Sequence, residues 1–136
     1  MRWPNTRELE SLSRCDLRDL VASLGQTHFL EIERCVEFVL AETTGLGHGR
    51  ARAKMCRRLK HCNLDSEQRR RLVFCITDRL TAGHFSQQFY DQLRLAIYLD
   101  QKRTFAAARQ CLTSASPDYV RRFAMWVIGH ERILSP

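Results

Sequence analysis

The chain has 136 residues, of which 44% are hydrophobic and 27% charged, and its formal net charge at pH 7 is +7. This length and composition predict one folded domain over residues 1–136 and exclude a disordered chain. No apolar run reaches the ~18 residues of a transmembrane helix, and the first residues carry no apolar secretory segment. We therefore expect an intracellular, cytoplasmic protein without a membrane partner.

Apolar residues recur at helical spacing in the first half of the chain, and no stretch alternates with the period of a strand. A short turn at residues 6–12 precedes a helix that Ser13 caps and Gly25 ends. Thr27 caps the next helix, and after a glycine-rich loop a basic helix runs from about Arg50 to His61. The side chains expected to face the core here are Leu17, Leu20, Val21, Leu24, Leu30, Ile32, Cys35, Val36, Val39, Leu40, Ala51, Met55, Leu59 and Cys62.

The second half shows the same spacing with clear helix-start signals. Asp65 and Gln68 predict a capping box for a helix that runs to about Thr81, with Gly83 after its end. Three more helix starts are predicted at Ser86, at Asp100 and at Ser116–Pro117–Asp118. The side chains expected to face the core are Leu72, Val73, Ile76, Leu80, Phe89, Leu93, Ile97, Tyr98, Phe105, Ala108, Cys111, Leu112, Val120, Phe123, Ala124, Val127 and Ile128, with Trp126 at the edge of the last apolar stripe.

These signals predict an all-α protein of six or seven short antiparallel helices, packed as a compact bundle or as a short superhelical stack of helical pairs. The segment CLTSASPDYVRRFAMWVIGH resembles the second half of a HEAT-type helical repeat. The pattern is a leucine-ended helix, a turn with Pro117–Asp118, then Val120–Arg121–Arg122 and an Ala–Trp–hydrophobic run. The resemblance covers Asp100 to His130 and implies HEAT-like helical pairs. It also implies that one of the two arginines bonds an acidic or carbonyl group of the adjacent turn.

Positive charge is concentrated in residues 50–71, which carry nine basic and two acidic side chains, whereas residues 1–49 have a net charge of −3. Clustered like charges mildly destabilise a helix, so this cluster favours an anionic partner. The alternative is a solvated face that pairs with the acidic N-terminal third, at Glu31, Glu33, Glu37 and Glu42. The candidate partner- or anion-binding residues are Arg50, Arg52, Lys54, Arg57, Arg58, Lys60, Arg69, Arg70, Arg71, Arg121 and Arg122.

The sequence offers little evidence for a catalytic site or a metal site. The cysteines and histidines form no CxxC or HxxxH pair, so we predict no metal site, no cofactor and no catalytic residue. Cys35, Cys75 and Cys111 lie among apolar residues, so we expect reduced thiols and no disulfide. The GLGHGR segment follows a predicted helix and lacks the Lys-Ser/Thr ending of a phosphate-binding loop. A weaker alternative is an anion held at the start of the basic helix.

We therefore predict a non-catalytic helical protein–protein interaction module. It acts as an adaptor or as an inhibitor, by analogy with immunity proteins that neutralise toxins, and its partner is another protein with an acidic surface. The alternative is a nucleic-acid-binding protein that uses the basic 50–71 surface through phosphate contacts. Aromatic side chains, which stack on single-stranded bases, are missing from that stretch.

Overall fold

The computed structural model describes residues 6–24, 29–113 and 115–134. These ranges form eight helices and no strand, which confirms the all-α prediction. The helices are α1 (Thr6–Glu10), α2 (Arg14–Ser23), α3 (Phe29–Ala41), α4 (His48–Leu59), α5 (Ser66–Ala82), α6 (Phe89–Leu99), α7 (Gln101–Gln110) and α8 (Asp118–Leu134). The count exceeds the predicted six or seven because the short first turn is a separate helix of five residues, α1.

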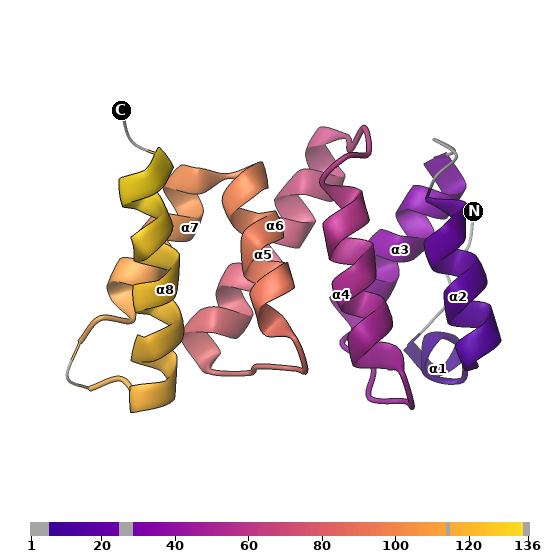
Figure 1. Cartoon of the computed structure of the whole chain (residues 1–136), viewed down its shortest axis with the longest axis horizontal. Coiled ribbons are helices and arrows are strands. Elements are labelled where there is room, and N and C mark those ends of the chain that lie inside the picture. Colours follow the sequence, from indigo (N-terminus) through magenta and orange to yellow (C-terminus); the bar gives the residue numbers. More distant parts are fainter. Residues whose placement is uncertain (1–5, 25–28, 114, 135–136) are drawn as a thin grey trace.

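The helices are stacked in two layers along the long axis of the molecule (Figure 1). In one layer α2 packs on α4 and α4 on α6, and in the other α3 packs on α5 and α5 on α7. Helices that follow one another in sequence join the layers, and α8 closes the stack against α7 and α5. As a result, α2 and α8 lie at opposite ends of the molecule.

Local capping explains where several helices begin and end. The Ser13 hydroxyl accepts a hydrogen bond from Asp16 N, and the Asp16 carboxylate accepts one from Ser13 N, so a capping box starts α2. Asp65 and Gln68 form the same reciprocal pair at the start of α5, and Asp100 accepts from Arg103 N at the start of α7. These three helix starts are predicted correctly because each cap depends only on residues within one turn.

Two predicted helix starts are wrong, and others cannot be placed. Helix α6 begins at Phe89 rather than after Ser86, because the Ser86 hydroxyl accepts a hydrogen bond of 3.0 Å from Gln92 Nε2 and caps no backbone. Helix α8 begins at Asp118, and its first backbone bonds go to the carbonyl of Pro117 rather than to Ser116. The predicted signals at Gly25 and Thr27 lie outside the described residues.

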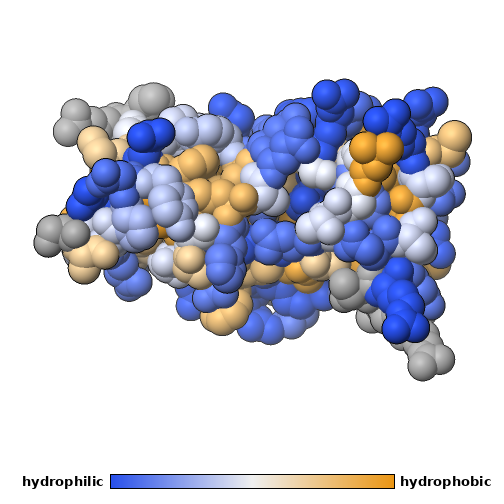
Figure 2. Space-filling model, turned by 90° about the horizontal axis from the view of Figure 1, so that it is seen from below, coloured by the Kyte–Doolittle hydropathy of each residue, from blue (hydrophilic) through white to orange (hydrophobic). Residues whose placement is uncertain are grey.

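The core runs along the stack between the two layers. Most of the predicted core side chains are buried, and Phe38, which the spacing did not select, is buried among them. Three side chains that were expected to face the core are exposed: Leu30, Tyr98 and Leu112. Leu30 lies in the first turn of α3 and Leu112 lies beyond the end of α7, where no described helix covers them. Figure 2 shows the underside of the molecule as mainly hydrophilic, with apolar side chains in separate areas.

Candidate anion-binding cleft

The basic stretch folds as two different helices, and α4 carries its charge on one side. Buried residues of α4 include Ala51, Met55 and Leu59, which face the core. The exposed side carries Arg50, Lys54, Arg57 and Arg58, as the helical spacing predicts. These four cations therefore share a surface, whereas the cations of α5 belong to a different helix in the other layer.

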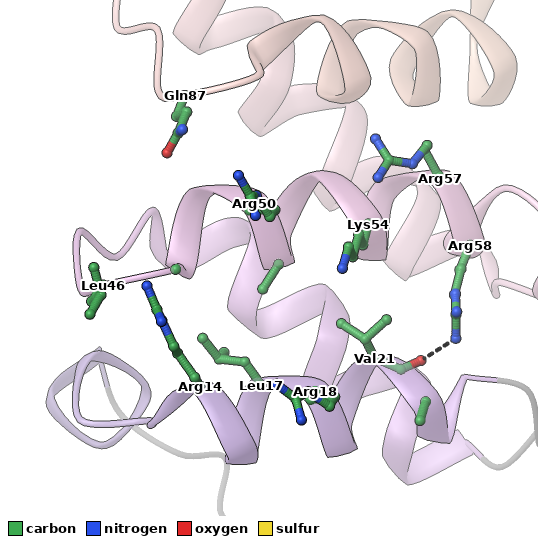
Figure 3. A pocket seen from close by; sticks show the side chains of 13 residues that line it. Arg14, Leu17, Arg18, Val21, Leu46, Arg50, Lys54, Arg57, Arg58 and Gln87 are labelled. Carbon is green, nitrogen blue, oxygen red and sulfur yellow. Dashed lines mark hydrogen bonds between the residues drawn. The ribbon is translucent and has the colours of Figure 1, made fainter.

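A cleft of about 890 Å³ lies between α2 and α4. Of the residues that the structure describes, six with cationic side chains line it and none with an acidic side chain does. Figure 3 shows residues of α2 on one side and residues of α4 on the other, with Leu46 near one end. The lining residues are Arg14, Leu17, Arg18, Val21, Ala22, Leu46, Gly47, Arg50, Ala51, Lys54, Arg57, Arg58 and Gln87.

Two of the six cations are held by the protein itself. Arg58 Nη1 donates to the carbonyl of Val21 at 3.0 Å, so it ties α4 to α2 (Figure 3). Arg57 Nη1 lies 2.9 Å from Asp91 Oδ2 and ties α4 to α6. The side chains of the other four cations have no ion-pair or hydrogen-bond partner among the described residues; they are Arg14, Arg18, Arg50 and Lys54. No described side chain neutralises their positive charge, so they give the cleft a positive electrostatic potential.

Arg14 and Arg18 are absent from the sequence-based candidates because they belong to the acidic N-terminal third. They stand four residues apart on a helix whose start at Ser13 is predictable, so they share one face. Asp16 and Asp19 of the same helix line a separate groove with Glu31 and Leu20. Helix α2 is thus basic along one edge and acidic along another, a division that its net charge conceals.

Arg52 is one of the predicted partner- or anion-binding residues, and the structure corrects this. Its residue surface is only 1% exposed, and Nη2 donates to both the carbonyl and the hydroxyl oxygen of Thr43. Burial, followed by the nearby charge of Arg79, lowers the pKa of the Arg52 guanidinium from its usual range. Arg52 therefore supports the fold at the loop before α4, and it contributes no charge to the cleft.

That loop, residues 42–47, shapes one end of the cleft and is tied down by His48. His48 Nε2 lies 2.9 Å from the carbonyl oxygen of Leu12, to which it donates, and Nδ1 lies 2.6 Å from the Thr43 hydroxyl. Gly45 packs on this imidazole so closely that a Cβ there would lie 2.6 Å from Nε2. Gly47 has a φ of 79°, a left-handed conformation that favours glycine. Leu46, between these glycines, is held outward with 74% of its surface exposed.

Except for Arg70, which pairs with Glu67 on the exposed surface of α5 itself, the cations of α5 and of the loop before it contact other helices. Arg71 bonds Glu33 at 2.5 Å and Glu37 at 2.7 Å, which joins α5 to α3. The hydrogen bond to Glu33 is the main reason that the pKa of Arg71 is raised above its usual value. Arg71 thus follows the alternative expectation, pairing with the acidic N-terminal third. The remaining contacts are those of Arg69 with the Leu99 carbonyl, Arg70 with Glu67, and Lys60 with the Tyr98 ring.

The two arginines of the opening turns of α8 have different environments. Arg121 pairs with Asp118, one turn earlier on the same helix, and Nη1 lies 3.4 Å from the carbonyl of Thr113. Arg122 is exposed. The Arg121 contacts are of the kind that the HEAT resemblance implies, but residues three apart pair on any helix. Both arginines lie at the other end of the stack from the cleft (Figure 1).

The remaining reactive groups do not converge on a second site. Within the described ranges, no three His, Cys, Asp or Glu side chains are grouped as metal ligands. All six cysteines are free thiols in this structure. Burial raises the pKa of Cys35 and of Cys56 to about 12, so both thiols keep their protons at neutral pH. None of the helices, as far as the structure describes them, has the length and apolarity to cross a membrane.

Comparison with known proteins gives no match: no family model, no curated protein and no solved structure is similar to this chain. The HEAT resemblance accordingly stays a prediction.

Proposed function

We propose that the protein is a non-catalytic helical interaction module, an adaptor or inhibitor, that binds an acidic surface of another protein through the α2–α4 cleft. The observation that carries this proposal is the lining of the cleft, which contains six cations and no acidic side chain. Four of those cations have no partner among the described residues, so they can form new ion pairs without breaking old ones. A partner that supplies carboxylates gains from long-range attraction as well as from contact.

A nucleic acid is the second candidate, because the same four cations can bind phosphates. The composition of the cleft favours a protein. Leu46, which is 74% exposed, lies at one end of the cleft, and the nearly buried Leu17, Val21 and Ala51 form part of its floor among the cations. Among the described residues, no aromatic side chain lines the cleft, whereas proteins that bind single strands commonly stack bases on aromatic rings. Apolar groups between cations match a protein surface better than a phosphate backbone.

Charge reversal in the cleft tests the proposal. The double variant Arg14→Glu/Lys54→Glu alters both sides of the cleft, and neither side chain bonds to another described residue. The matched control, Lys102→Glu/Arg103→Glu, changes the same charge on exposed residues of α7, away from the cleft. Each protein is immobilised and exposed to nuclease-treated native lysate, and the bound proteins are compared. Because exposed charges contribute only about 0–1 kcal/mol to stability, both variants should fold normally.

We expect the wild type and the control to retain a partner protein, and nuclease treatment should not reduce its recovery. The cleft variant should retain at least about tenfold less of this protein, because its two attractive charges become repulsive. Equal recovery by the cleft variant would place binding elsewhere on the molecule and overturn the proposal. Material that disappears on nuclease treatment would instead identify the nucleic-acid candidate as correct.

A further inference from the structure

The two sides of the α2–α4 pair are not equivalent. On one side α3 packs against both helices, and it occupies the groove that any two adjacent helices form between them. No residue of α3 lines the cleft, so the cleft is a separate groove of the same pair. A groove between two packed helices has the shape to receive a third helix, and no helix that the structure describes occupies that position here.

The charges beside this groove repeat at the spacing of a helix. Arg14 and Arg18 are four residues apart on α2, and Arg50 and Lys54 are four residues apart on α4. Four residues of an α-helix rise about 6 Å, slightly more than one turn. Each side of the groove therefore presents two cations about one turn apart, with none of the four bound to another described residue.

The surface between the charged rows is apolar. Leu17 and Val21 from α2 and Ala51 from α4 form it. Their exposed area is small, but Leu46 extends it at one end, and the aliphatic stems of the neighbouring arginines add to it. A ligand that carries only charge leaves this strip uncovered. A helix with a narrow apolar stripe and carboxylates on both flanks covers the strip and also pairs with the cations.

We infer that the occupant of the cleft is an acidic amphipathic α-helix supplied by the partner protein. This inference rests on the proposed function and specifies the segment that the module recognises. The apolar stripe of the helix contacts Leu46 and the aliphatic stems of the cleft arginines, above the nearly buried Leu17, Val21 and Ala51. Glutamate or aspartate side chains on its two flanks pair with Arg14 and Arg18 on one side and with Arg50 and Lys54 on the other.

Synthetic probes test this directly. One peptide of about 14 residues, long enough to span α4, places leucines at positions i, i+3, i+4 and i+7 and glutamates on both flanks. A second peptide has the same composition in an order that destroys the apolar stripe. A single-stranded oligothymidine of similar length is the third probe. Fluorescence anisotropy gives the Kd of each probe for the wild type, Arg14→Glu/Lys54→Glu, Leu46→Ser and the control Lys102→Glu/Arg103→Glu.

The inference predicts that the amphipathic peptide binds the wild type about tenfold or more tightly than the rearranged peptide, and gains helical circular dichroism on binding. Arg14→Glu/Lys54→Glu should weaken its binding about tenfold or more, Leu46→Ser should weaken it more than it weakens the rearranged peptide, and the control should change neither.

Two results overturn the inference and separate it from the proposed function. If both peptides bind equally and both depend on Arg14 and Lys54, the cleft recognises acidic protein by charge alone. The inference that the ligand is an acidic helix is then wrong, and the proposed function stands. If the oligothymidine binds more tightly than either peptide and with the same dependence, both proposals are wrong.

Discussion

Arg50 and Arg52 stand two positions apart in one helix and have opposite environments. Arg50 is exposed at the cleft, whereas Arg52 is enclosed and bonded to Thr43. The difference follows from the helical turn of about 100° per residue, which places Arg52 on the side of α4 that faces the core. A buried guanidinium requires acceptors, and the loop that ends α3 provides them. The same residue type is therefore exposed at one position and bonded to the chain itself at the other.

This difference predicts a matched pair of stability effects. Arg52→Ala should lower the free energy of unfolding by about 3 kcal/mol, because it opens a cavity and leaves the Thr43 carbonyl without its donor. Arg50→Ala, on the exposed side, should change it by less than about 0.5 kcal/mol. Urea denaturation followed by circular dichroism measures both. Equal effects of the two substitutions would contradict the burial of Arg52.

At the scale of the element, α8 shows how an apolar stripe becomes a packed face. Val120, Ala124 and Val127 are buried against the rest of the stack, where α8 contacts α7 and α5. Trp126 lies at the edge of that face and is half-buried. Its ring contacts Tyr90, and the guanidinium of Arg94 lies 5.2 Å from the ring centroid. The indole thus covers the side of the face rather than filling its centre.

Substitutions on the two sides of α8 should separate packing from helix formation. Val127→Ala removes two methyl groups from a side chain with no exposed surface, so it should cost about 2 kcal/mol of unfolding free energy. Met125→Ala, at a position 66% exposed, should cost less than about 0.5 kcal/mol. Thermal melts of the two variants give the comparison. A melting temperature unchanged by Val127→Ala would mean that α8 packs on a different side.

At the scale of the whole molecule, arginines connect helices that are neighbours in the stack. Arg58 links α4 to α2, Arg57 links α4 to α6, and Arg71 links α5 to α3. Arg79, nearly buried, donates to the carbonyl of Leu40 at 2.8 Å and to Gln92 at 2.8 Å, so it joins α5 to α3 and to α6. Several arginines are therefore internal contacts between helices, whereas four of the cations in the cleft have no partner among the described residues.

The core between the layers also predicts a dependence on alkaline pH. Burial raises the pKa of Cys35 and of Cys56 from 9.0 to about 12. In the unfolded chain both thiols lose their protons from about pH 9, so above that pH the unfolded state binds fewer protons than the folded state. Stability contributed by these thiols is complete below about pH 9 and is lost as the pH rises toward 12.

Urea denaturation between about pH 8 and about pH 10.5 should therefore show a falling free energy of unfolding, with each thiol contributing at most about 1.4 kcal/mol per pH unit. The variant Cys35→Ala/Cys56→Ala is less stable at neutral pH because it loses core volume, but its decline with pH should be shallower. Cys15→Ala, at an exposed position, should keep the wild-type slope. An identical slope in all three proteins would show that Cys35 and Cys56 are not buried in the native state.

Local features of the sequence determined the helices and most of their caps. The Ser13–Asp16 and Asp65–Gln68 boxes and the apolar spacing of α8 depend on residues within one or two turns, so they can be read without a fold. The same holds for the shared face of Arg50, Lys54, Arg57 and Arg58. Ser86 shows the limit of such reading, because its hydroxyl binds a side chain from the next helix instead of the backbone that follows it.

Only the tertiary structure decided which cations are free. Arg71 is neutralised by glutamates more than 30 positions away, and Arg52 is removed from the surface by the packing of α4. The cleft itself requires α2 beside α4, which brings Arg14 and Arg18 to the same surface as Arg50 and Lys54. Burial and pairing between distant segments depend on which helices become neighbours. That choice is made by the packing of apolar faces across the whole chain, and no local pattern of charge contains it.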